Sequence, residues 1–211
     1  MSPAPTISNQ QARNLALSAQ GFQDQFSSLD QVLAKTQVFQ LDSVNVFERA
    51  HLLPAFSRMG AYPLSEFEAW AFSQPQIAEE WAHCAAVVTK ADWALFDFRR
   101  QESLARQSVQ TMLKEQAKTI RWIKSELASN GPMTVSQFEH DQNKRRGNWW
   151  GWSEVKLLLE RLYDCGELVS AGRTKFSRLY ALPEQVELPK PTLSEPAQQL
   201  ALISKSVAAI G

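Results

Sequence analysis

The sequence is poor in cysteine and has no long apolar run. Its two cysteines, Cys84 and Cys165, lie far apart and form no C-x-x-C pair, so we expect reduced, buried thiols and no zinc site. No run reaches the roughly 18 apolar residues of a membrane-spanning helix. Residues 1–9 lack the basic and apolar segments of a secretory signal. These absences predict a cytoplasmic protein, in the nucleoid if it acts on DNA, with no membrane contact.

The chain also lacks net charge, because its 22 Lys and Arg residues balance its 22 Asp and Glu residues. On its own this argues against strong binding to nucleic acid. The charges are unevenly distributed, however. Residues 99–180 contain fifteen basic and nine acidic residues, residues 1–98 contain five and ten, and the last 31 residues contain two and three. A basic middle in a neutral chain predicts a local surface that faces phosphate, if it is functional.

The 211 residues, 44% of them hydrophobic, suffice for one large domain or two small ones with a buried core. Apolar residues recur at helical spacing, most clearly in residues 153–164. Two short strands are predicted within residues 77–88, and a β-hairpin with a Gly-containing turn at residues 168–182. Further helices are predicted at residues 8–22, 28–36, 65–72, 92–108 and 99–129.

The order of elements indicates the fold class. Helix, short helix, amphipathic helix and hairpin follow one another in residues 99–185, which is typical of a winged helix, and residues 1–98 show the same order less clearly. We therefore predict a mainly α protein with small β-wings, built as tandem winged-helix (helix-turn-helix) domains. The expected boundaries are 1–98 and 99–185, with residues 186–211 as a Pro-rich linker and the start of a further domain.

The most distinctive polar residues lie in residues 39–60. Apolar and polar residues alternate up to Asp42, which predicts a short half-buried strand. Side chains two apart on a strand share a face, so Gln40 and Asp42 should point the same way. This would place an amide beside a carboxylate.

A helix is expected to follow this strand, because Asp42 is a good N-cap residue. It should begin near Val44 and place Asn45 and Arg49 along one stripe. Pro54 should kink or break it, and Gly60 should end it.

These residues resemble the signature of the bacterial winged-helix DNA glycosylases of the AlkZ and YcaQ kind. The Gln-x-Asp form is similar to the YcaQ-like branch of that family. The resemblance spans nearly the whole chain, through residues 40–42, 43–46, 49–51, 57–60, 81–83, 149–152 and 171–173. It implies that Gln40 and Asp42 are catalytic in removing N7-alkylated purines from double-stranded DNA and in unhooking interstrand crosslinks.

The resemblance also concerns the extent of the chain. Family members usually continue into a third winged helix and a β-rich domain. The chain therefore looks like the first half of that architecture, either a fragment or a natural short form, and a partner chain or a missing second half would complete it.

The chemistry of such a reaction suits a carboxylate. An N7-alkylguanine is cationic and already a good leaving group, so hydrolysis needs a positioned water and negative charge near the oxocarbenium-like sugar. Asp42 can accept a proton from that water and Gln40 can hold it. Neither a metal nor another cofactor is required. The alternative from spacing alone is that Asp42 only caps a helix, which contributes about 1 kcal/mol.

Further residues are candidates for DNA contact. Asn45 and Arg49 could extend the site toward phosphate or ribose; otherwise they form a solvated helix face. A basic loop before a cluster of tryptophans predicts phosphate contact, and a basic hairpin predicts contact of a wing with the backbone or minor groove. These residues are Lys144, Arg145, Arg146 and Trp149 in the loop, and Arg173, Lys175 and Arg178 in the hairpin.

Two alternatives to a glycosylase remain open at this point. A winged-helix DNA-binding or regulatory module without catalysis, or an inactive fragment, fits the same domains and basic middle. A protein-interaction scaffold is a weaker alternative, since winged helices also bind proteins. We interpret His51 and His83 as structural histidines. Cys84 stands where the family commonly has an acidic residue, so no role is assigned to it.

Overall fold

Two hydrophobic cores organise the chain, one in each half. The computed structural model describes residues 6–138 and 154–211. The first core is formed by residues between Leu29 and Val87, and the second by residues between Ile120 and Leu182. The described residues are mainly helical with two small antiparallel sheets, which confirms the predicted composition of the fold. None of their helices is long and apolar enough to cross a membrane.

The first core combines helices with a three-stranded sheet of order β1-β3-β2. Its elements are α1 (Asn9–Ala19), α2 (Leu29–Thr36), β1 (Phe39–Gln40), α3 (Leu53–Met59), α4 (Leu64–Ser73), β2 (Ile77–Trp81) and β3 (Ala85–Thr89). Phe39 is fully buried, and its ring centroid lies 5.7 Å from that of Phe67 and 5.5 Å from that of Trp70. Phe67 and Trp70 both face inward because they lie three residues apart on α4.

The helix predicted from Val44 is wrong. The Asp42 carboxylate accepts a hydrogen bond from the backbone N–H of Val44 at 2.8 Å, and Asn45 pairs with Arg49 in an isolated antiparallel bridge. Local bonds from an Asp side chain compete with helix formation, and valine is a poor helix former. Residues 43–48 therefore form a loop between β1 and the next helix, which we call the motif loop.

Helical structure begins after the motif loop, at the 3-10 turn η1 (Ala50–Leu52), and continues as α3. Pro54 lies in the first turn of α3, where a missing N–H costs no helical hydrogen bond. It therefore starts the helix and does not kink it. Gly60 ends α3 with φ 81°, as predicted.

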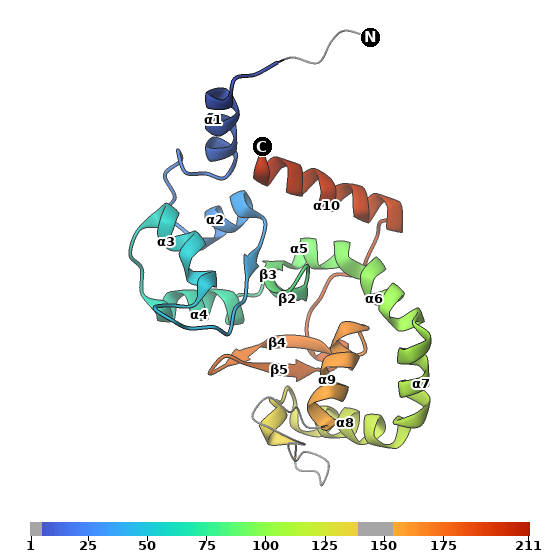
Figure 1. Ribbon diagram of the computed structural model, residues 1–211. Coiled ribbons are helices and arrows are strands. Elements are labelled where there is room, and N and C mark those ends of the chain that lie inside the picture. The colour runs from blue at the N-terminus through green and yellow to red at the C-terminus, as the bar shows by residue number, and fades with distance from the viewer. Residues whose placement is uncertain (1–5, 139–153) are drawn as a thin grey trace.

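A run of helices connects the two cores along one side of the molecule (Figure 1). It consists of α5 (Lys90–Trp93), η2 (Ala94–Phe96), α6 (Asp97–Ala105), α7 (Gln107–Glu115) and α8 (Ala117–Asn130). The long helical stretch predicted over residues 99–129 is present, but it is divided into three helices, because Arg106 adopts extended backbone angles and Gln116 marks a second break. Arg100 pairs with the buried Glu80 of β2 and so attaches α6 to the first core.

The second core is built from α8, η3 (Val135–Gln137), α9 (Glu154–Asp164), β4 (Val169–Thr174), β5 (Ser177–Ala181) and η4 (Pro183–Gln185). The predicted amphipathic helix and hairpin are confirmed. The buried face of α9 consists of Val155, Leu158, Leu159, Leu162 and Tyr163. The hairpin turn places Lys175 and Phe176 at positive φ, 45° and 64°, which directs the Phe176 ring back toward the first core, where it meets His51.

The last helix, α10 (Glu195–Ile210), returns to the first half of the chain and lies beside α1 in Figure 1. The buried Gln198 accepts a hydrogen bond from the backbone N–H of Phe98 at 3.0 Å and donates one to the carbonyl of Leu193 at 2.9 Å. Lys205 pairs with Asp92 at 3.1 Å. Residues that we expected to begin a further domain thus pack partly onto α5 and α6.

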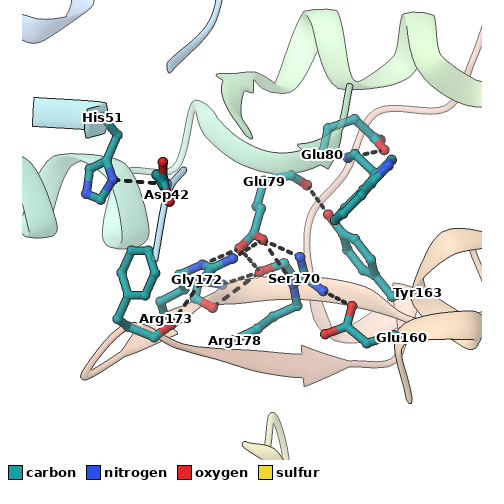
Figure 2. A network of polar contacts seen from close by, with 12 residues as sticks. Asp42, His51, Glu79, Glu80, Glu160, Tyr163, Ser170, Gly172, Arg173 and Arg178 are labelled. Carbon is teal, nitrogen blue, oxygen red and sulfur yellow. Dashed lines mark hydrogen bonds and ion pairs between the residues drawn. The ribbon is translucent and has the colours of Figure 1, made fainter. Parts of the chain in front are cut away.

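The two halves of the chain meet at a buried carboxylate on β2 (Figure 2). Glu79 accepts hydrogen bonds from Arg173 at 2.9 and 2.6 Å, from Arg178 at 3.0 and 2.6 Å, and from the Ser170 hydroxyl at 3.1 Å. The side chains of Glu79, Arg173 and Arg178 are 3%, 10% and 5% exposed. Burial raises the pKa of Glu79, but the guanidinium groups outweigh burial and hold this pKa below its usual range. Arg178 also pairs with Glu160 of α9 at 2.6 Å.

Close backbone packing accompanies this ion-pair cluster. A Cβ atom at Gly172 of β4 would lie 2.3 Å from the backbone oxygen of Phe72, and Gly172 has φ 102°. Only glycine fits this approach of the hairpin to α4. The Tyr163 hydroxyl adds a hydrogen bond to the backbone carbonyl of Glu79 at 3.2 Å.

We predict that Glu79→Gln lowers the free energy of unfolding by about 3 kcal/mol or more, because it removes the carboxylate that two buried guanidinium groups share and leaves only Glu160 to pair with Arg178. The matched control Glu187→Gln removes an exposed carboxylate and should change it by less than about 0.5 kcal/mol. Chemical denaturation of the purified chains measures both values.

The same variant tests the pH dependence. Because folding lowers the pKa of Glu79, its stabilising contribution is complete above about pH 4.3, the pKa of an unfolded glutamate, and is lost as the pH falls through the lower folded value. Acid should therefore destabilise the wild type more steeply than Glu79→Gln. If the free energy of unfolding of both chains falls equally steeply as the pH is lowered, Glu79 is not the source of this pH dependence.

Candidate functional site

The polar motif lies at the end of β1, against the turn that joins β2 to β3. The Gln40 side-chain oxygen lies 3.1 Å from Nε2 of His83 in that turn. The backbone N–H of Leu41 donates to the carbonyl of Ala85 at 2.8 Å. Burial, and after it the Asp42 carboxylate, raise the pKa of Cys84, which places this carboxylate near the same turn. Gln40 and Asp42 therefore border one region of the surface.

The Asp42 carboxylate is only partly engaged. One oxygen, Oδ1, accepts the bond from the backbone N–H of Val44. Within residues 6–138 and 154–211, no group donates a hydrogen bond to Oδ2, and no cation pairs with this carboxylate. Asp42 is half-buried and Gln40 is exposed, so the site is accessible from solvent. A partly engaged carboxylate beside an amide can hold a water molecule and take its proton.

His51 supports Asp42 from the interior. Its Nδ1 accepts a hydrogen bond from the backbone N–H of Asp42 at 3.3 Å, as Figure 2 shows. The side chain is buried, and burial together with the Arg49 and Arg173 guanidinium groups lowers the pKa of His51 to about 4. His51 is therefore neutral near pH 7 and positions the backbone of Asp42. This agrees with its interpretation as a structural histidine.

The ring of Phe176 connects the hairpin turn to this site. It stacks on the His51 ring with a centroid distance of 5.5 Å and an interplanar angle of 8°. The Arg49 guanidinium carbon lies 3.8 Å from the Phe176 ring centroid, and that of Arg173 lies 4.8 Å from it. The Nε atom of Arg49 is buried and has no hydrogen-bond partner among the described residues. Phe176 thus fixes both His51 and Arg49 beside the motif.

The structure separates the residues that we predicted to bind DNA. Asn45 and Lys175 are exposed, and Arg49 is partly buried against Phe176. Arg173 and Arg178 face Glu79 in the interior, where their side chains are 10% and 5% exposed. Their contact with phosphate stays a prediction, and in this arrangement their guanidinium groups are paired within the protein. The remaining candidates, Lys144, Arg145, Arg146 and Trp149, lie outside the described residues.

Sequence reasoning missed Glu79 and Phe176, although one signal pointed to Glu79. Arg173 and Arg178 are direct cross-strand partners in the β4–β5 register. Like charges in that arrangement are destabilising unless an anion lies between them. A buried strand that contains Glu79 was the natural source of that anion. No sequence pattern indicated that Phe176 would contact His51.

A family model described as DNA glycosylase AlkZ-like matches residues 33–211. The matched range contains Gln40, Asp42, His51 and Phe176, and therefore the whole site described above. No solved structure matches the chain.

We predict that the imidazole C–H signals of His51 titrate with a midpoint near pH 4, well below the usual value of about 6.5, because protonation would place a cation in a buried site beside two guanidinium groups. Two-dimensional NMR of the imidazole groups measures this midpoint, with His51→Gln to assign the signal. Nitrogen shifts should show the Nε2–H tautomer. A midpoint near pH 6.5 would show that His51 is solvated and does not support Asp42.

Proposed function

Because the chain belongs to the AlkZ-like DNA glycosylase family, we propose that it hydrolyses the N-glycosidic bond of N7-alkylated purines in double-stranded DNA, including purines in interstrand crosslinks, with Asp42 and Gln40 activating water. The observation that supports this most directly is the partly engaged Asp42 carboxylate beside Gln40, on an accessible surface within the matched range.

The proposed reaction needs little acid catalysis. The alkylated base carries a positive charge and leaves as a neutral molecule, so positive charge develops on the sugar. Asp42 stabilises that charge and accepts the proton of the attacking water, while the Gln40 amide orients the water. The Gln40 oxygen is held by His83, which restricts the amide to one orientation. Neither step requires a metal or an organic cofactor.

The proposed domains follow the two cores. Each core contains several helices and an antiparallel strand pair, β2 with β3 in the first and β4 with β5 in the second. We propose that these are tandem winged-helix domains over residues 1–98 and 99–185. On this proposal, the wing of the second domain packs against the motif of the first through Phe176 and is not directed wholly toward DNA.

The proposed DNA contacts are revised accordingly. Asn45 and Arg49 adjoin the motif, and Lys175 is the exposed cation of the hairpin turn. The basic segment 144–146 remains a candidate from sequence. We expect a Lys144/Arg145/Arg146→Ala triple variant to bind duplex DNA more weakly and to lower the slope of log affinity against log salt by about two to three, since each lost phosphate contact contributes about 0.9.

Fluorescence anisotropy at several salt concentrations measures that slope. A triple variant with an unchanged slope would exclude segment 144–146 from the interface. Arg173→Ala serves as a contrast, because its main effect should be on folding through Glu79.

The decisive prediction concerns Asp42. Asp42→Asn keeps a side-chain oxygen for the Val44 N–H and removes the negative charge. Folding and DNA affinity should change little, while base release from N7-methylguanine DNA should fall by about two orders of magnitude or more. Gln40→Ala should act in the same direction with a smaller effect. Alkaline cleavage of the product strand at abasic sites measures the rate.

Glu48→Gln is a matched control, because it removes an exposed carboxylate from the motif loop itself. It should leave the rate within about twofold of wild type if nearby charge alone is unimportant. If Asp42→Asn and the wild type release the base at equal rates, Asp42 has only a structural role. A wild-type chain that binds DNA but releases no base would instead support a non-catalytic DNA-binding module.

A further inference from the structure

The motif loop, residues 43–48, exposes apolar side chains directly beside Asp42. Phe47 is 95% exposed, Val46 is 78% exposed and Val44 is 62% exposed. Single exposed apolar residues are common on protein surfaces, but a phenylalanine that buries almost none of its ring contributes nothing to the core. The exposure of Phe47 therefore has no explanation in the stability of this fold.

The loop is nevertheless held in place at both ends. At its start, the Asp42 carboxylate accepts the N–H of Val44 at 2.8 Å. Across its base, Asn45 pairs with Arg49, and the Arg49 guanidinium lies 3.8 Å from the Phe176 ring centroid. These local contacts, together with the contact between Arg49 and Phe176, offset the entropy cost of ordering the ends of the loop. Val46 and Phe47 are therefore presented to solvent from a base that is already ordered.

The position of the loop indicates what it meets. Phe47 is the fifth residue after Asp42, so their Cα atoms lie within about 18 Å of each other. A nucleotide whose glycosidic bond faces Asp42 therefore brings its neighbouring base pairs within reach of Phe47. Apolar side chains that DNA-binding proteins insert between base steps unstack and kink the duplex. An aromatic ring gains stacking energy there that it lacks in water.

We propose that Val46 and Phe47 form an apolar wedge that enters the base stack of duplex DNA next to the nucleotide facing Asp42. This inference rests on the proposed function, in which the damaged nucleotide lies with its glycosidic bond facing Asp42. A wedge of this kind opens the stack beside the damaged base and gives water access to the sugar. It does so without full extrusion of the base, which a crosslink to the opposite strand resists.

The test uses the full chain and a duplex that carries 2-aminopurine beside one N7-methylguanine. The fluorescence of 2-aminopurine rises when it is unstacked. We expect the wild type to raise it on binding and Phe47→Ala to abolish the rise, with about tenfold weaker binding and an unchanged salt slope, since no charge is lost. Phe47→Trp should retain the rise, because indole also stacks. Phe56→Ala is the matched control, because it removes an exposed phenylalanine that lies on α3 and not in the motif loop. It should behave as wild type.

Base release, measured on the same complexes, separates the wedge from the glycosylase proposal. A rise that depends on Phe47 without base release would support the wedge and contradict the proposed function. If the wild type releases the base without a rise in fluorescence, or if the rise persists in Phe47→Ala, the wedge proposal is wrong. The glycosylase proposal is not affected by either result. If Phe47→Ala instead abolishes self-association in sedimentation experiments and leaves the fluorescence rise intact, the loop is a contact between copies of the chain and the wedge is wrong.

Discussion

The buried carboxylate of Glu79 is the constraint on which the rest of the structure depends. Burying one carboxylate and two guanidinium groups has a large desolvation cost, which is offset only because Arg173, Arg178 and Ser170 together satisfy the Glu79 oxygens. This cluster fixes the β4–β5 hairpin against β2. The hairpin in turn holds Phe176 against His51. Through these contacts, an ion pair in the junction determines where the backbone of Asp42 lies.

The same cluster explains part of the uneven distribution of charge along the sequence. The sequence has an acidic first half and a basic middle, which we interpreted as a surface for phosphate. In the structure, Glu79 and Glu80 of the first half pair with Arg100, Arg173 and Arg178 of the middle. Part of the asymmetry therefore holds the two halves together. Two of the three hairpin cations, Arg173 and Arg178, are among the basic residues that have a partner within the protein.

The sequence predicted elements whose stability is local and missed those that depend on distant partners. The α9 helix follows from Val155, Leu158 and Leu162 at helical spacing, and the hairpin from its strand and turn residues. The helix expected at Val44 failed because the Asp42 side chain bonds the backbone locally. The fate of Arg173 could not be predicted, because Glu79 lies 94 residues away along the chain. Gln40 and Asp42 were found by their motif, whereas His51 and Phe176 became connected to them only through the tertiary fold.

The electrostatics around Asp42 suit the proposed reaction in a specific way. A carboxylate that must stabilise a cationic sugar should not already be neutralised by a protein cation. Two basic side chains, those of His51 and Arg49, adjoin the motif, and neither neutralises this carboxylate. Burial keeps His51 neutral, and the Phe176 ring holds the Arg49 guanidinium by a cation–π contact. Among the described residues, no ion pair joins Arg49 to Asp42. The second half of the chain thereby preserves the negative charge of a residue in the first half.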